Sequence, residues 1–190
     1  MAALLATALV LGLIPADAAR AETCTYGIIP EPSSQVRTYA TDLGLAFAIP
    51  QNYRMRSLWG YSRDGEYQVQ LEVVDPATFV YDQCLVEQGE LLGERTPPLF
   101  TVRDVSLRTS SDLETAVRER YPWLMSNAFI DEVNGVQMLG TYYQNDYQQQ
   151  LKAVFWLVDG GDRLVVLEGL IDDPANEAAI ERAIASMVID

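Results

Sequence analysis

Neighbouring carboxylates are the side chains of this chain with the clearest capacity for chemistry. They occur at four places: Asp64 and Glu66, Asp131 and Glu132, Asp159 and Asp162, and Asp172 and Asp173. Such pairs can act as general acid and base or bind Ca²⁺ through hard oxygen ligands. However, the third pair flanks Gly160-Gly161 and the fourth precedes a helix start, so local turn and cap roles are expected. We predict no metal site, although the carboxylates leave room for a weak Ca²⁺ site.

Other catalytic patterns are missing from the sequence. The chain has no histidine, which removes Ser-His-Asp and Cys-His arrangements and any histidine-ligated metal. No serine lies in G-x-S-x-G or S-x-x-K, and no glycine-rich phosphate loop occurs. We therefore predict no catalytic residue and no cofactor. The alternative that stays open is a secreted hydrolase with two carboxylates about 5–10 Å apart across a pocket.

Charge restricts the partners. The 190 residues include 27 acidic and 13 basic side chains, which gives a formal charge of −14. A field of this sign repels phosphate, so we expect neither nucleic-acid binding nor strong binding to anionic membranes. The arginines between residues 95 and 120 are expected to form exposed ion pairs rather than a basic face.

The first 21 residues have the pattern of an export signal. The apolar run at residues 2–14 is too short to span a bilayer, and it is followed by small residues that end at Ala21. We expect cleavage near Ala21, which places the protein outside the cytosol, in the periplasm, a thylakoid lumen or the medium. An uncleaved apolar helix is the alternative, because the segment before the run contains no Lys or Arg.

Export would affect the redox state of the two cysteines. In an oxidising compartment Cys24 and Cys84 are expected to form one disulfide, with two buried free thiols as the alternative. The bridge would close a loop worth about 4 kcal/mol in the chain-entropy model. It would also fix residues 22–41, which contain Pro30 and Pro32 and are predicted to be an extended arm.

Residues 42–190 are predicted to form a single α+β domain, an antiparallel sheet of about seven strands with helices on both faces, as in a three-layer sandwich. Strands are expected at 43–49, 53–59 and 66–74, as a meander, and at 99–107 with a bulge at Arg103-Asp104. Residues 75–98 are predicted to be irregular, apart from a possible short edge strand at 84–88.

The second half has clearer signals. A capping box at residues 111–114 begins a helix, and Asn134-Gly135 predicts a hairpin that joins 129–133 to 136–143. The segments 151–158 and 163–171 are apolar at both odd and even positions, so both faces of each strand would be apolar, which is typical of central strands. Asp173 and Pro174 begin a last helix.

Several short sequence segments are together similar to those of a known family. They are Gly44 to Pro50 followed by Tyr53-Arg54-Met55, the Asn134-Gly135 hairpin, the segment from Phe155 to Gly161, and Ile184 to Met187. Over residues 42–189 the chain resembles the PsbP-like and DcrB-like superfamily of exported proteins. The resemblance implies a non-enzymatic accessory or assembly role in the cell envelope. Because the chain has no histidine and only one lysine, Lys152, it does not imply metal binding or a photosystem role here.

The predicted binding residues lie in an aromatic and amide-rich stretch, residues 142–150. Tyrosine rings give contact area at low entropic cost, and amides form adaptable hydrogen bonds. We therefore predict an exported interaction module that contacts a protein of the envelope or of a membrane complex. Its predicted partner-binding residues are Tyr142, Tyr143, Asn145, Tyr147 and Gln149. A solvated hairpin end with packed tyrosines and a carrier with an apolar cavity remain alternatives, and the oligomeric state stays open.

Overall fold

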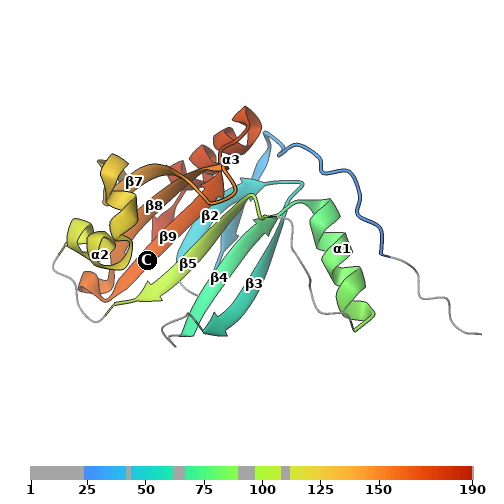
Figure 1. Cartoon of the computed structure of the whole chain (residues 1–190), viewed down its shortest axis with the longest axis horizontal. Helices are drawn as coiled ribbons and strands as arrows, with labels where there is room; N and C mark the ends of the chain where they lie inside the picture. The colour runs from blue at the N-terminus through green and yellow to red at the C-terminus, as the bar shows by residue number, and fades with distance from the viewer. Residues whose placement is uncertain (1–23, 42–43, 62–66, 90–96, 108–111, 190) are drawn as a thin grey trace, which may run out of the picture.

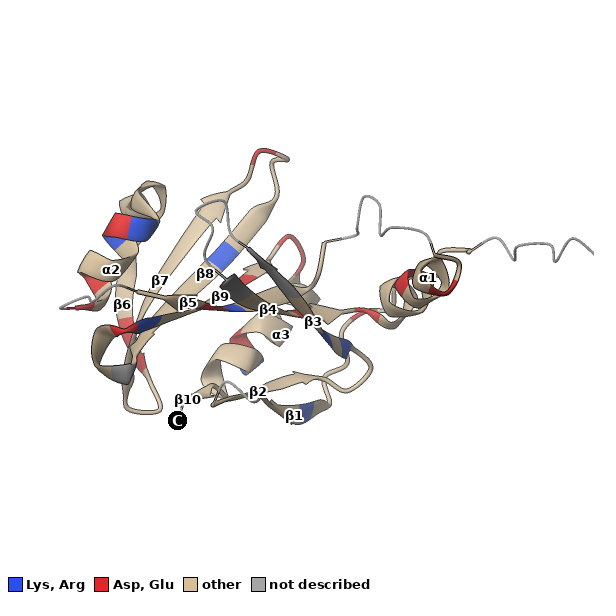
Figure 2. Cartoon of the chain, turned by 90° about the horizontal axis from the view of Figure 1, so that it is seen from below, with Lys and Arg blue, Asp and Glu red and all other residues tan. Residues whose placement is uncertain are grey.

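The computed structural model describes residues 24–41, 44–61, 67–89, 97–107 and 112–189. The predicted export signal lies outside these residues. The fold is α+β: a seven-stranded antiparallel sheet in the order β3-β4-β5-β9-β8-β7-β6, and a three-stranded sheet in the order β1-β2-β10. Figure 2 shows the large sheet edge-on, with α2 on one face and with α3 and the small sheet on the other. The predicted fold class is therefore confirmed.

Ten strands, three α-helices and two short 3-10 helices make up the described chain. Their bounds are β1 Val36–Ala40, β2 Leu45–Pro50, β3 Arg54–Tyr61, β4 Tyr67–Val74, α1 Pro76–Glu87, β5 Phe100–Ser106, α2 Leu113–Arg120, η1 Pro122–Asn127, β6 Phe129–Val133, β7 Val136–Gln144, β8 Gln150–Val158, η2 Asp159–Gly161, β9 Arg163–Leu170, α3 Pro174–Ala185 and β10 Val188–Ile189. The strands β9 and β8 lie inside the large sheet, as their apolar sequences predict (Figure 1).

One face of the large sheet packs against α3 and β2. This core includes Phe47, Phe100, Trp156 and Ile180, each nearly inaccessible to solvent. Helix α3 approaches β9 closely at Gly169, where a Cβ atom would lie 2.6 Å from Ile180 Cδ1 and 2.8 Å from Phe100 Cβ. The absence of a side chain at this position therefore sets the spacing between the helix and the sheet.

The opposite face packs against α2 and η1. Leu113, Ala116 and Val117 of α2 are buried there, together with Phe155 of the sheet. Asp112 begins the helix by accepting a hydrogen bond from the Thr115 amide at 2.8 Å. The predicted hairpin is also confirmed, because Asn134 and Gly135 join β6 to β7 with φ angles of 52° and 81°.

The structure corrects the predicted meander. Strands β3 and β4 pair as expected, but β2 pairs with β1 and β10 in the small sheet. In addition, residues 36–40 of the predicted arm form strand β1. The sequence did not reveal either point, because β2 is apolar at both parities and gives no sign of which sheet it joins, while β1 is an exposed edge strand.

The prediction of irregular structure at 75–98 was wrong for its first half. Residues Pro76–Glu87 form α1, and Cys84 therefore lies in a helix rather than in an edge strand. Pro76 occupies the first turn, where a missing N–H costs nothing, and Asp75 caps it. Only Thr78 and Leu85 are buried, so the helix carries no apolar stripe that a periodicity search would detect.

The predicted bulge at Arg103-Asp104 was also wrong. Strand β5 pairs without interruption with β9, from Phe100 with Gly169 to Ser106 with Arg163. Arg103 binds Glu168 at 2.9 Å and Asp104 binds Arg163 at 2.9 Å, both across the same strand pair. The polar residues interrupt the apolar pattern because they form cross-strand ion pairs, not because the backbone changes register.

Candidate functional site

A cavity of about 700 Å³ lies at the end of the large sheet where β4 and β9 end and β5 and β8 begin. This volume falls within the range of ligand-binding cavities, roughly 300–1,000 Å³. Six parts of the chain line it: the arm, the residue before β3, the residue before α1, the loop before β5, the turn before β8, and the segment from the end of β9 to the start of α3. The lining residues are Ile29, Pro30, Glu31, Pro32, Tyr53, Asp75, Pro97, Pro98, Leu99, Gln149, Leu170, Asp172, Asp173, Pro174, Ala175 and Asn176.

Two helices begin at this cavity, each with the sequence Asp-Pro. Asp75 Oδ1 accepts hydrogen bonds from the amides of Ala77 and Thr78 at 2.8 and 2.9 Å. Asp173 Oδ1 does the same for Ala175 and Asn176, also at 2.8 and 2.9 Å. Each of the two carboxylates thus caps its own helix and lies against the positive end of the helix dipole.

Tyr53 forms part of the cavity wall and is almost fully buried. Its hydroxyl donates a hydrogen bond to the Pro30 carbonyl at 3.2 Å. Burial raises the pKa of Tyr53 to about 12, and the negative charges of Asp75 and Asp173 add to the shift. The two capping carboxylates therefore both disfavour ionisation of the same buried hydroxyl.

The arm forms one wall, and it is held at several points. Cys24 and Cys84 form the predicted disulfide, with Cα atoms 5.9 Å apart, which joins the start of the arm to α1. Further along, Asn52 Nδ2 donates to the Glu31 carbonyl and Asn52 Oδ1 accepts from the Ser33 amide, both at 2.9 Å. The wall thus depends on one covalent bond and a few polar contacts.

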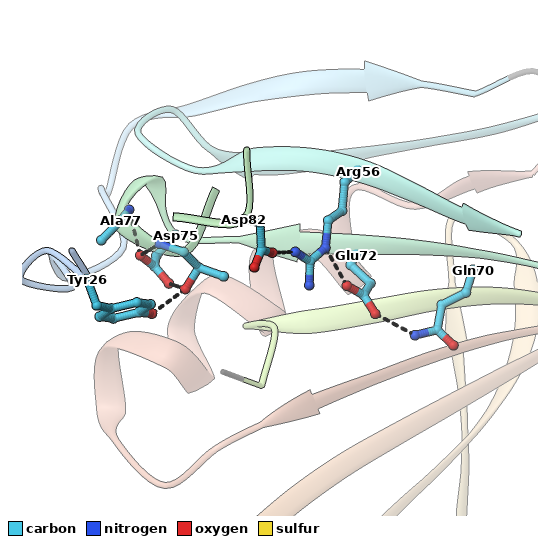
Figure 3. Close-up of polar contacts among 8 residues, drawn as sticks. Tyr26, Arg56, Gln70, Glu72, Asp75, Ala77 and Asp82 are labelled. Atoms are coloured by element: carbon cyan, nitrogen blue, oxygen red, sulfur yellow. Dashed lines mark hydrogen bonds and ion pairs between the residues drawn. The ribbon is translucent and has the colours of Figure 1, made fainter. Parts of the chain in front are cut away.

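Polar contacts help to attach helix α1 to the sheet and the arm (Figure 3). Arg56 of β3 binds Glu72 of β4 at 2.6 Å and also forms an ion pair with Asp82 of α1. Gln70 Nε2 donates to the second oxygen of Glu72 at 2.8 Å. Near the other end, the Tyr26 hydroxyl forms a hydrogen bond with Thr78. This network positions the helix that carries Cys84, and with it the start of the arm.

The predicted binding residues lie on different surfaces of the protein. Asn145 organises the turn before β8: its Oδ1 accepts from the amides of Tyr147 and Gln149 at 3.0 Å, and its Nδ2 donates to Gln149 Oε1 at 2.8 Å. Gln149 lines the cavity, whereas Tyr147 projects into solvent with 84% of its surface exposed. The turn therefore joins an exposed ring to the cavity.

Tyr142 and Tyr143 point to opposite faces of the large sheet. Tyr142 stacks on Phe129 at 5.8 Å between ring centroids, and the Lys152 Nζ lies 5.3 Å from the Tyr142 ring. Burial raises the pKa of Tyr143, and the charge of Glu168 and a hydrogen bond to Glu168 raise it further. Both tyrosines thus contact neighbouring strands, so the two do not form one surface with Tyr147.

Lys152 is the single lysine of the chain, and its side chain is only 5% exposed. It forms an ion pair with Glu181 of α3. Burial opposes its charge, but the hydrogen bond and the charge of Glu181, followed by Tyr142, outweigh this effect and raise the pKa of Lys152. The contact ties β8 to α3, which is a structural role.

Among the carboxylate pairs whose side chains the structure describes, only Asp172 and Asp173 line the cavity. Asp131 and Glu132 are exposed on β6, and Asp64 and Glu66 lie outside the described residues. The sequence prediction missed Asp75, Glu31 and Tyr53, although Asp75-Pro76 repeats the Asp173-Pro174 signal. Within the part of the chain that the structure describes, no group of three or more Asp, Glu, Cys or His side chains could hold a metal ion.

Comparisons with known proteins give structural similarity only. No family model and no curated protein matches the sequence. The structure is similar to the solution structure of cyanobacterial PsbP (CyanoP) from Synechocystis sp. PCC 6803, with 12% identity over 87% of this chain and 98% of that chain, at a TM-score of 0.48. It is also similar to a crystal structure from Bacteroides thetaiotaomicron VPI-5482, with 10% identity over 77% of this chain and 45% of that chain, at a TM-score of 0.41. Since both TM-scores are below 0.5, neither likeness assigns a family or a function.

None of the helices that the structure describes has both the length and the apolar character needed to span a membrane.

Proposed function

We propose that this protein is a non-enzymatic accessory module that contacts a protein partner of the cell envelope or of a membrane complex. We assign the contact surface to the cavity together with Ile28 and Tyr147, and we call this surface the cavity end. The module would act outside the cytosol, in a periplasm, a thylakoid lumen or the medium. The disulfide between Cys24 and Cys84 supports an oxidising compartment, since such bridges persist there.

The main observation in support of this proposal is the exposure of two apolar side chains. Ile28 is 94% exposed and Tyr147 is 84% exposed, the highest values among the large hydrophobic residues that the structure describes. Ile28 immediately precedes Ile29 in the cavity wall, and Tyr147 lies two residues before Gln149. Single exposed apolar residues are common, but two beside one cavity are expected where a partner supplies the missing burial. An exposed tyrosine is also a frequent anchor in protein interfaces.

Two of the four carboxylates that line the cavity, Asp75 and Asp173, are engaged in helix caps, which argues against a hydrolytic role for this pair. A hydrolase would need two of them free to exchange protons or to attack a substrate. Asp75 and Asp173, which both act on Tyr53, each use an oxygen to cap a helix. A contact surface needs no such freedom, and it benefits from carboxylates held in fixed positions.

Affinity capture from envelope extract of the native source tests the proposal. The bait is the disulfide-intact protein, compared with Tyr147→Ala, Ile28→Ser and the control Trp123→Ala. Trp123 is 67% exposed but lies in η1, which packs with α2 away from the cavity. We expect one partner to be lost with both cavity-end variants and retained with the control. Equal capture by all four baits would contradict the proposal, as would release of product from a polysaccharide or peptide substrate by the purified protein.

A further inference from the structure

We propose that the cavity end binds an extended segment of the protein partner that carries arginine or lysine next to proline or other apolar residues. This inference rests on the proposed function and specifies the chemistry of the partner. The apolar part of the segment would contact the cavity walls, and its basic side chains would lie at the rim.

The walls are rigid and apolar. Five of the sixteen lining residues are prolines, and they come from three separate parts of the chain: Pro30 and Pro32, Pro97 and Pro98, and Pro174. Proline has a fixed φ and no N–H to satisfy, so a wall rich in proline is preformed and has few exposed donors. Binding to a preformed wall loses little conformational entropy, and Leu99 and Leu170 add further apolar surface.

The rim is acidic. Glu31, Asp172 and Asp173 line the cavity and are exposed, Asp75 lines it as a buried residue, and no lysine or arginine is among the lining residues. Asp75 and Asp173 are offset in part by the helix ends that they cap. Glu31 and Asp172 are exposed, and neither carboxylate has a hydrogen bond or an ion pair to the described part of the protein. These two carboxylates are therefore available to a cationic ligand.

Two further groups fit a peptide. Gln149 Oε1 accepts from Asn145, which leaves the Gln149 Nε2 to donate to a carbonyl of an extended chain. Burial is the main cause of the raised pKa of Tyr53 in the cavity wall, and the charges of Asp75 and Asp173 add to it. In addition, Ile28 and Tyr147, which are close in sequence to the lining residues Ile29 and Gln149, offer exposed apolar side chains outside the cavity.

The test uses a fluorescent twelve-residue peptide that alternates arginine and proline, and a control peptide with citrulline in place of arginine. Fluorescence anisotropy with the disulfide-intact protein measures each affinity at low salt. We expect the arginine peptide to bind at least tenfold more tightly than the citrulline peptide. We also expect its affinity to fall as salt rises.

Two matched double variants locate the effect. E31Q/D172N removes both rim charges, and E119Q/E132Q removes two exposed charges from α2 and β6, so the two proteins have the same net charge. We expect the rim variant to weaken binding of the arginine peptide about tenfold, as for two exposed ion pairs, and the control variant to weaken it less than twofold. Circular dichroism checks that both variants fold.

Three results would overturn the inference: no binding of the arginine peptide at millimolar concentration, equal weakening by the two variants, or spermine binding as tightly as the peptide. Equal weakening would mean attraction by the overall charge of −14. Any of these results, combined with loss of the native partner in Tyr147→Ala, would leave the proposed function in place and reject only the cationic segment.

Discussion

Removal of the disulfide should destabilise the fold and release one wall of the cavity. The double variant C24S/C84S opens a loop in which the two cysteines are 60 residues apart. In the chain-entropy model this bridge contributes about 4 kcal/mol, because it restricts the unfolded chain. Part of this loss is offset if residues 24–32 become mobile in the folded variant, because their hydrogen bonds to the rest of the fold are few. We therefore expect the free energy of unfolding to fall by about 2–4 kcal/mol.

Urea titration followed by circular dichroism and by tryptophan fluorescence measures this change. With a urea dependence of about 2 kcal/mol per molar, the midpoint should fall by roughly 1–2 M. The wild type treated with dithiothreitol serves as the matched control and should give the same midpoint as the variant. Hydrogen exchange should also become faster at residues 24–32. A loss below about 1 kcal/mol, or unchanged exchange in the arm, would refute the assigned role of the bridge.

Three further predictions concern the packing and the charges of the fold. Gly169→Ala places a methyl group against Ile180 and should lower the free energy of unfolding by about 1–3 kcal/mol in urea titration; a neutral result would mean that α3 is more loosely packed than the structure indicates. Folding raises the pKa of Tyr53 to about 12, so above pH 10 the folded state holds more protons than the unfolded chain. The free energy of unfolding should therefore fall by on the order of 2 kcal/mol as the pH rises from 10 to 12. Tyr53→Phe should remove this contribution to the pH dependence of stability. Lys152→Met removes a buried ion pair but keeps a side chain of similar volume, and Glu181 keeps access to water, so the free energy of unfolding should change by less than about 1.5 kcal/mol in thermal unfolding. Lys152→Ala should lower the free energy of unfolding by about 2–4 kcal/mol, because it also leaves a cavity. Equal losses in both variants would show that the charge of Lys152 matters more than its volume.

The elements that could be predicted from the sequence are those with a local signal. The Asn134-Gly135 turn requires two positive φ angles, and few other residue pairs tolerate them. Asp173 with Pro174 identifies the start of α3, and the apolar segments of β8 and β9 predict strands inside the sheet. In each case the physical cause lies within a few neighbouring residues.

Apart from the disulfide, which the presence of two cysteines predicts, features that depend on distant contacts could not be predicted. Helix α1 buries only Thr78 and Leu85 and is attached through Arg56 and Cys24, which are distant in the sequence. The second sheet requires β10 to meet β2 from the other end of the chain.

The candidate site could be predicted only in part, for the same reason. The sequence indicated the turn that carries Tyr147 and Gln149, because its composition is unusual. It gave no sign that the arm, the proline pair at residues 97 and 98 and the start of α3 would meet that turn. The prediction also grouped Tyr142 and Tyr143, whose side chains alternate across the sheet.

Site-specific photo-crosslinking in cells of the native source tests the proposed contact most directly. A photoreactive phenylalanine analogue replaces Tyr147 in one protein and Trp123 in another, both of them exposed aromatic positions. We predict a discrete crosslink to one envelope or membrane protein from position 147 and none to that protein from position 123. Crosslinks of the same pattern from both positions, or no crosslink from position 147, would contradict contact at the cavity end.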